Sequence, residues 1–137
     1  MDNLPVVDGP STSPERVVER FIDDVLNGGR PEAASDLVDN DLLRRRAAAL
    51  RRSFDDLRVR IVRVVSQDAM VAVHLVATGT HTGRFQGGEP TGRAWSSTAT
   101  AIFEVRRGRI VDFWLTWDML DILDQLGLIV WAAEPGP

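Results

Sequence analysis

This chain contains two histidines, His74 and His81, and a histidine side chain can donate or accept a proton near neutral pH. It contains no cysteine, which excludes disulfides, thiolate nucleophiles and zinc–thiolate sites. Two isolated histidines have no spacing typical of a metal site, so no metal is expected. Histidine and carboxylate side chains are therefore the candidates for proton transfer in this chain.

A glycine-rich segment, residues 80–92, is of the kind that often borders a binding site. It lacks the Gly-Lys-Ser/Thr sequence that nucleotide-binding loops need, so it predicts no phosphate site. The formal net charge is -4, with 16 cationic residues, all of them arginine, against 20 acidic ones. This balance argues against a nucleic-acid partner or an acidic membrane surface. The arginines at 44–46 and 51–52 are interpreted as solvated faces of a helix. The alternative is that these arginines attract an acidic carrier protein.

A length of 137 residues fits one domain with a single core and one main pocket. The longest apolar runs are far shorter than the ~20 residues that a membrane span needs, and no targeting signal is visible. Because cysteine is absent, the cytoplasm is the expected location. We expect a flexible N-terminal arm over residues 1–12, the domain over 13–128 and a C-terminal tail over 129–137.

Three helices are expected in the first half of the chain. Ser13 can cap the first of them, over residues 14–26, because its hydroxyl can accept a hydrogen bond from a free backbone N–H. Pro14 suits the first helical position, and apolar residues recur at helical spacing after it. Shorter patterns of the same kind predict helices over residues 31–38 and 41–54.

After residue 56 the pattern changes to that of β-strands. Runs rich in β-branched residues predict two hairpins, and an amphipathic helix ending at Gly127 follows them. The four strands are expected over residues 57–65, 70–78, 94–105 and 110–117. Because no strand–helix–strand alternation occurs, a parallel sheet is not expected. The predicted fold class is α+β: a cone-shaped, curved antiparallel sheet packed on three N-terminal helices, with a short C-terminal helix.

Several short segments carry a resemblance to a known family. They are residues 20–29 (RFIDDVLNGG), 77–83 (ATGTHTG) with 90–92 (PTG), 102–105 (IFEV) with 108–111 (GRIV), and 124–127 (DQLG). Each segment is weak alone, but their order and spacing together are specific. The chain resembles the SnoaL-like polyketide cyclases, which are relatives of ketosteroid isomerase.

The resemblance implies an apolar pocket for a polycyclic or long polyketide, chemistry without a cofactor, and a homodimer or homotetramer formed through the outer face of the sheet. Family members use a carboxylate as general acid/base in an intramolecular aldol closure. An apolar pocket raises the pKa of a carboxyl group toward neutrality and so suits it to this work. The side chains expected to bind the substrate are Phe21, Val25, Phe54, His81, Ala101, Phe113, Leu115 and Trp117.

The chain departs from the family pattern at two facing positions. Many members carry an aspartate directly after the tryptophan of the last strand, where this chain has Leu115 after Trp114. A histidine or aspartate often lies opposite, where this chain has Ala101. We therefore expect an interior that is more apolar and less acidic than is usual in the family.

Asp118 and His74 are the predicted catalytic residues. Asp118 lies where relatives commonly have aspartate, and its alternative role is to cap the helix that begins at Met119. His74 lies in a strand, and its alternative role is to point outward and contact a second subunit. His81 belongs to the loop shared with the family, and its alternative role is to fix that loop by hydrogen bonds.

The expected function is that of a cofactor-independent cyclase in the biosynthesis of polyketides or related secondary metabolites such as antibiotics. Aldol, cycloaddition and epoxide-opening closures are all open. With Leu115 and Ala101 apolar, the shape of the pocket would supply most of the assistance, because holding reacting ends together lowers the entropic barrier. The alternative is an accessory protein that binds a ligand in the same pocket and has lost catalysis.

Overall fold

The helical layer is built by the first part of the chain. The structure, a computed structural model, describes residues 13–28 and 30–132. Val17, Phe21 and Val25 of the first helical segment are buried, because apolar residues at helical spacing share the face that meets the core. The helices are, in order, α1 (Pro14–Arg20), η2 (Phe21–Asn27), η3 (Pro31–Ala33), α2 (Ala34–Leu37) and α3 (Asp41–Ser53).

The first helical segment differs in geometry from the α-helix expected over residues 14–26. It begins as expected, since Ser13 Oγ accepts a hydrogen bond from the backbone N–H of Arg16 at 3.2 Å. From Phe21 the chain continues as the π-helix η2, which ends at Asn27. Apolar spacing over two turns does not distinguish a π-helix from an α-helix, so the sequence could not predict this change.

One antiparallel sheet follows the helices, with the strand order β1-β2-β3-β4. The β3–β4 hairpin turns through Arg107 at φ +54° and Gly108 at φ +74°. Glycine adopts this left-handed conformation without steric cost, which explains why Gly108 suits the turn. The strands are β1 (Arg58–Gln67), β2 (Met70–Thr80), β3 (Ala94–Arg106) and β4 (Arg109–Trp117).

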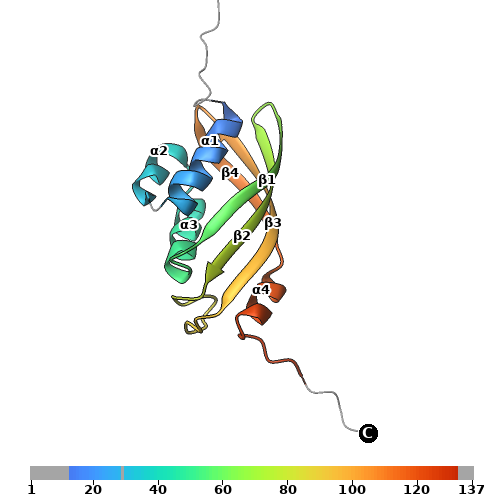
Figure 1. Cartoon of the computed structure of the whole chain (residues 1–137). Coiled ribbons are helices and arrows are strands. Elements are labelled where there is room, and N and C mark those ends of the chain that lie inside the picture. Colours follow the sequence, from blue (N-terminus) through green and yellow to red (C-terminus); the bar gives the residue numbers. More distant parts are fainter. Residues whose placement is uncertain (1–12, 29, 133–137) are drawn as a thin grey trace, which may run out of the picture.

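The two faces of the sheet have different surroundings. Side chains alternate between the faces along each strand, and Val71, Val73 and Leu75 of β2 are buried. Helices α1, α2 and α3 lie on one side of the curved sheet, and α4 (Met119–Gln125) lies at its far end (Figure 1). On the outer face, the side chain of Trp114 is 49% exposed. The α+β fold expected from the sequence is confirmed.

An asparagine from the helical layer contacts each edge strand of the sheet. On β1, Asn27 Nδ2 donates to Val59 O at 2.7 Å and Asn27 Oδ1 accepts from Val59 N–H at 2.6 Å. On β4, Asn40 Nδ2 donates to Val111 O at 3.1 Å, while Asn40 Oδ1 accepts from Leu43 N–H at the start of α3. An unpaired strand edge is a template for pairing with another chain. The two amides therefore tie helix ends to the sheet and occupy part of its free edges.

The glycine-rich loop between β2 and β3 packs against the end of α3. Ser53 O accepts a hydrogen bond from Gly83 N–H at 2.9 Å, and Ser53 Oγ donates to Arg84 O at 2.6 Å. A Cβ atom at Gly83 would lie 1.9 Å from Arg52 O, so only glycine fits this close approach. The loop is therefore held against the helical layer at this end of the sheet.

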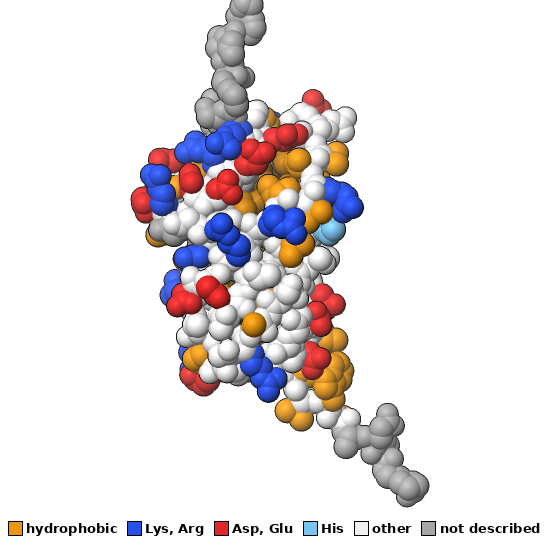
Figure 2. Space-filling model, in the orientation of Figure 1, with side chains coloured by type: hydrophobic (Ala, Val, Ile, Leu, Met, Phe, Trp, Pro, Cys, Tyr) orange, Lys and Arg blue, Asp and Glu red, His pale blue; other side chains and the backbone are white. Residues whose placement is uncertain are grey.

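The C-terminal helix α4 docks on the start of β3. Gln125 Nε2 donates to Ser96 O at 2.9 Å, and Gln125 Oε1 accepts from Ser96 N–H at 2.9 Å. Ile122 and Leu126 are buried beneath the helix. Hydrophobic side chains gather on the surface around α4, and charged side chains of both signs lie over the helical layer (Figure 2). The helix is thus fixed by one pair of polar contacts and a small apolar contact.

No helix within residues 13–28 and 30–132 is long and apolar enough to cross a membrane. The expected N-terminal arm, residues 1–12, lies outside the described residues. The last residues of the expected tail, 133–137, also lie outside them.

Candidate functional site

An apolar chamber lies between the inner face of the sheet and helices η2 and α3. Its volume is about 90 Å³. Of the described residues that line it, Arg46 of α3 is the one that carries a charge. The strands contribute the floor, with Ala77 on β2, Ala99 and Ala101 on β3, and Leu115 on β4.

Small side chains in the middle of the sheet make room for the chamber. In the strand register, Ala101 lies opposite Leu115, and Ala99 lies between Leu75 of β2 and Trp117 of β4. Because Ala99 and Ala101 project only methyl groups toward the helices, they leave space between Trp95 and Phe103 of the same strand that larger side chains would fill. The larger neighbours Leu75, Leu115 and Trp117 form the walls around this space.

The chamber adjoins a second hollow of about 360 Å³ between α3 and the glycine-rich loop. Four residues line both spaces: Arg46, Leu50, Leu115 and Trp117. We call the chamber and this hollow together the cleft. The hollow has polar walls as well as apolar ones, since Ser53 and Arg84 line it. The cleft therefore has an apolar inner end and a more polar outer end.

Among the residues that the structure describes, no carboxyl group and no histidine lines the cleft. The positions where family members often carry ionisable groups, Ala101 and Leu115, face each other across β3 and β4 and both line the chamber. The described part of the chain also holds no group of three or more side chains that could bind a metal ion. The cations at the cleft are Arg46 and Arg84.

The family of the chain follows from its sequence match. A family model described as SnoaL-like polyketide cyclase matches residues 16–126. The chain belongs to this family. The resemblance carried by the sequence motifs is thus confirmed, although no match was found among curated proteins.

Solved structures share the SnoaL-like fold with this chain. TsrD from Streptomyces laurentii has a TM-score of 0.77 at 19% identity, over 90% of this chain and 100% of that chain. IdmH from Streptomyces antibioticus has a TM-score of 0.71 at 25% identity, over 83% of this chain and 98% of IdmH. A SnoaL-like polyketide cyclase from Agrobacterium tumefaciens strain C58 has a TM-score of 0.71 at 19% identity, over 84% of this chain and 98% of that chain. These similarities show a shared fold.

Most of the residues predicted to bind the substrate line the cleft of this SnoaL-like chain. Those that do are Phe21, Ala101, Phe113, Leu115 and Trp117. Val25 instead lines a separate hollow beside α3, on the side of Ala48 and Arg51. Phe54 is completely buried, with its ring centroid 4.9 Å from those of Phe85 and Trp95. Val25 and Phe54 therefore do not line the cleft, although Phe54 packs against two residues that do, Phe85 and Trp95.

His81 is completely buried beneath the glycine-rich loop. Thr91 N–H donates to His81 Nδ1 at 3.1 Å, so Nδ1 is an acceptor and the ring hydrogen is assigned to Nε2. No described residue accepts a hydrogen bond from Nε2, and the ring lies 6.2 Å from that of Phe54. The histidine therefore contacts the loop and the aromatic core, and it does not line the cleft.

The two predicted catalytic residues lie outside the cleft of this SnoaL-like chain. Asp118 is exposed at the start of α4, where its Oδ1 accepts a hydrogen bond from Asp121 N–H at 3.0 Å. His74 alternates with the buried residues of β2 and so faces the outer side of the sheet, with Nδ1 3.0 Å from a guanidinium nitrogen of Arg63. These contacts match the alternative roles of the two residues, a helix cap and an outer-face histidine.

Sequence reasoning missed Arg46 and Ala99 as lining residues. Ala99 could have been found, because it lies two positions before Ala101 and side chains two apart in a strand share a face. For Arg46 the available signal was helical spacing: it lies between Leu43 and Leu50 on the stripe of α3 that faces the sheet. Its place among three consecutive arginines concealed that signal.

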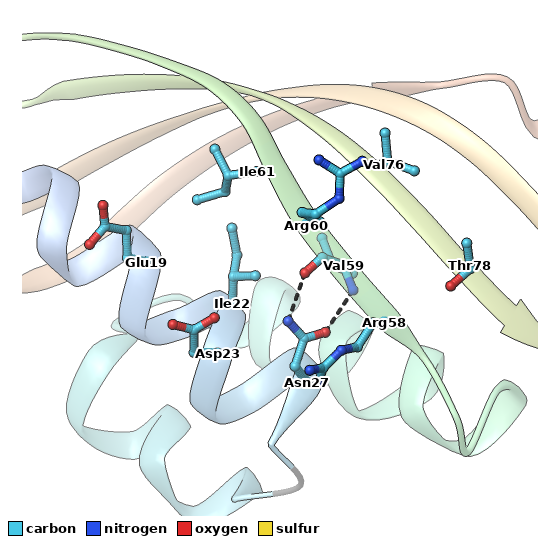
Figure 3. A pocket seen from close by; sticks show the side chains of 10 residues that line it. All are labelled: Glu19, Ile22, Asp23, Asn27, Arg58, Val59, Arg60, Ile61, Val76 and Thr78. Carbon is cyan, nitrogen blue, oxygen red and sulfur yellow. Dashed lines mark hydrogen bonds between the residues drawn. The ribbon is translucent and has the colours of Figure 1, made fainter.

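A second pocket of the chain is a groove of about 370 Å³ between the first helical segment and β1 (Figure 3). The carboxylates of Glu19 and Asp23 enter it from the helical side, and Arg58 and Arg60 enter it from β1. Its walls also include the apolar side chains of Ile22, Val59, Ile61 and Val76, so charged and apolar groups are mixed, whereas the chamber of the cleft has one charged lining residue. This groove therefore suits an apolar ligand less well than the chamber does.

Asp56 is the described carboxyl group whose pKa clearly departs from its ordinary value. The Thr80 hydroxyl donates to Asp56 Oδ2 at 2.7 Å, and Thr80 N–H donates to Asp56 Oδ1 at 2.7 Å. These two hydrogen bonds lower the pKa of Asp56 because they stabilise its charged form. Asp56 is exposed and does not line the cleft, so this shift concerns stability rather than catalysis in the cleft.

Proposed function

We propose that this chain binds an apolar, polyketide-derived molecule in the cleft and promotes its intramolecular ring closure without a cofactor. The observation that carries the proposal is the facing pair Ala101 and Leu115 at the floor of a chamber with apolar walls. A chain-like ligand folds against such walls because folding buries more of its apolar surface. A folded ligand has its reacting ends close together.

Shape supplies the catalytic assistance in this proposal. Holding two reacting groups in contact removes much of the entropic barrier, and effective molarities of about 10⁵–10⁸ M are known for well-oriented intramolecular reactions. No acid or base is required for a cycloaddition. In an epoxide opening, an internal hydroxyl oxygen bonds to carbon as the epoxide C–O bond breaks and the hydroxyl proton passes to the epoxide oxygen, so no base has to remove a proton from carbon. These closures therefore suit the cleft better than an aldol closure, which needs a base to remove a proton.

The dimensions of the cleft favour a ligand that occupies both of its parts. Pockets that enclose small molecules usually have volumes of about 300–1,000 Å³. The chamber, at about 90 Å³, holds only a small part of such a ligand, whereas the outer hollow, at about 360 Å³, lies within this range. One end of the ligand would therefore enter the chamber, and most of it would lie in the hollow.

A second candidate function is ligand binding without catalysis. It is favoured by the lack of any carboxyl group or histidine among the described residues that line the cleft. An accessory protein of this kind would shield an apolar intermediate from water or deliver it to another enzyme. Such a protein needs the walls of the cleft but no reactive group.

Turnover distinguishes the two functions. A linear polyketide with a conjugated diene and a separate alkene, presented as an N-acetylcysteamine thioester, would be incubated with the chain, and cyclic products would be measured by liquid chromatography with mass spectrometry. Product formation above the uncatalysed rate contradicts the binding function. Saturable binding of the thioester with no gain in rate contradicts the cyclase.

Substitution of the two predicted catalytic residues tests the role of shape. Asp118→Asn and His74→Ala are each expected to keep turnover within about twofold of wild type, because neither side chain lines the cleft and asparagine caps a helix as well as aspartate does. The rate constants of both variants would be measured on the same thioester. A tenfold loss in either variant, with an unchanged free energy of unfolding, would show that an acid or base takes part.

We also propose that copies of this chain associate through the outer face of the sheet. Ile102 and Trp114 are direct partners on β3 and β4, and they are 37% and 49% exposed. Adjacent exposed apolar side chains on a sheet favour burial against another surface. A homodimer or homotetramer would cover them.

A further inference from the structure

Arg46 is distinguished from its neighbours in the sequence by the surface that it occupies. Arg44 NH1 donates to Val38 O, and Arg44 also forms an ion pair with Asp41. Arg45 and Arg46 are both exposed, but Arg45 does not line the cleft. Arg46 lines both the chamber and the outer hollow, so its side chain lies at the boundary between them.

The charge of Arg46 is not neutralised by a nearby carboxylate. It forms no ion pair with any residue that the structure describes, and its guanidinium carbon lies 5.9 Å from the ring centroid of Phe113. The other cation of the cleft, Arg84, is paired with Glu89 at 2.5 Å. The cleft thus contains one unpaired positive charge, and none of its described lining residues carries a negative one.

We propose that the ligand of the cleft is an apolar molecule with an anionic oxygen at one end, such as a carboxylate, phenolate or enolate, and that Arg46 binds this oxygen. The inference rests on the proposed function, because it concerns the ligand of the same cleft. The apolar body of the ligand enters the chamber, and its charged end stays at the boundary with the hollow.

Two physical reasons support this orientation. An anion deep in the chamber would lose its hydration without gaining a partner, because the chamber floor is made of alanine and leucine side chains. At the boundary, the planar guanidinium group can donate two parallel hydrogen bonds to a carboxylate, or charge-assisted hydrogen bonds to the single oxygen of a phenolate or enolate. The contact with Phe113 supports the side chain while leaving its N–H donors available.

A pair of fluorescent dyes with one shared skeleton provides the test. Anilinonaphthalene sulfonate is an apolar anion, and N-phenyl-naphthylamine is its neutral counterpart without the sulfonate. Their dissociation constants would be measured by fluorescence titration on the full chain, at low and high salt. The variants are Arg46→Met, which keeps the apolar stem, and Arg45→Met as the matched control on the same helix.

The proposal makes a selective prediction for these variants. Arg46→Met is expected to bind the sulfonate dye about tenfold more weakly, because a hydrogen bond to a charged group is lost, and to bind the neutral dye within twofold of wild type. Arg45→Met is expected to bind both dyes as wild type does. Unchanged sulfonate binding in Arg46→Met overturns the inference. An equal loss of sulfonate binding in Arg45→Met also overturns it, because the dye would then be attracted by the overall positive potential of the helix and not by a contact with Arg46.

Failure of the proposed function has a different result. Ala101→Leu, which fills the chamber, should weaken binding of the neutral dye, and Ala99→Leu provides a second variant if the first does not fold. If the neutral dye does not bind, or binds equally well to correctly folded forms of these variants, the cleft is not an apolar binding site and both proposals are wrong. Loss of neutral-dye binding in the filled variants, with equal sulfonate binding in wild type and Arg46→Met, overturns only the role of Arg46.

Discussion

Ala101 and Leu115 determine the chemistry of the cleft at the scale of single residues. They face each other across β3 and β4, and neither can take up or release a proton. The polar side chains that the sequence offered as substitutes have other contacts: Asp118 caps α4, and His74 contacts Arg63 on the outer face. Residue chemistry therefore favours enclosure over acid/base assistance.

His81 is expected to act on stability through the loop that it holds. His81→Ala leaves a buried cavity and removes the acceptor of Thr91 N–H, so we expect the free energy of unfolding to fall by about 2–4 kcal/mol. Urea unfolding at neutral pH measures this loss. His74→Ala on the outer face is the control, with an expected change under about 0.5 kcal/mol. Similar losses in both variants would contradict a special role for His81.

Asp56 predicts a pH dependence of stability. The pKa of Asp56 is lowered in the folded chain. Its contribution to the free energy of unfolding is therefore present above about pH 4, near the ordinary pKa of aspartate, and is lost as the pH falls through the lower pKa of the folded chain. Asp56→Asn should cost about 1 kcal/mol or less at pH 7, because the site is exposed, and this difference should shrink as the solution is acidified. Urea unfolding at several pH values tests the sign. A difference that grows in acid would contradict it.

At the scale of elements, two asparagine side chains link the ends of helices to the edge strands of the sheet. Asn27 at the end of η2 contacts β1, and Asn40 at the start of α3 contacts β4. Each side chain uses both its donor and its acceptor. The helical layer is therefore held at both edges of the sheet, and the chamber lies between these attachments.

The two asparagines should differ in their response to the same substitution. Asn27→Asp loses the donor to Val59 O and places a negative charge at a helix C-terminus, so we expect a loss of about 1–3 kcal/mol. Asn40→Asp also loses its donor, but the charge then lies at the N-terminus of α3, where aspartate caps well, so its loss should be smaller. Urea unfolding ranks the two variants. The reverse ranking would contradict this account of the edges.

At the scale of the whole molecule, helices α1, α2 and α3 lie on one side of a single sheet (Figure 1). The other face presents exposed apolar side chains. Such an arrangement buries the cleft within one chain but leaves Ile102 and Trp114 in contact with solvent. Association through the outer face would remove this exposure. It would also stiffen the sheet that forms the floor of the chamber.

Self-association can be tested by introducing one charged side chain on the outer face of the sheet. We expect the wild-type chain to sediment as a dimer or tetramer and Trp114→Lys to shift toward the monomer, because burying an unpaired lysine is costly. Trp131→Lys is the control, since Trp131 is also exposed but lies after α4, outside the sheet. Analytical ultracentrifugation over a range of concentrations measures both. A monomeric wild type, or equal dissociation of both variants, would contradict the proposed interface.

The sequence by itself determined the class of fold and most of the element positions. Helical spacing before Phe54 and strand alternation after it depend only on local geometry, so they are visible without any tertiary contact. Phe113, Leu115 and Trp117, which were expected to bind the substrate, alternate along β4 and so share a face, and all three line the cleft. Local sequence patterns therefore identified part of the residues that line the cleft.

Only the tertiary structure decided which face meets the helices, how deep the chamber is, and which arginine reaches it. A period of two residues divides a strand into two faces but does not say which one is covered, and this is why His74 could not be placed from the sequence. The depth of the chamber depends on Ala99 and Ala101 lying beside larger residues of neighbouring strands, and the access of Arg46 depends on how α3 is rotated over the sheet. Local spacing assigns Ala99 and Arg46 to one face of their strand or helix, but what that face meets depends on long-range contacts.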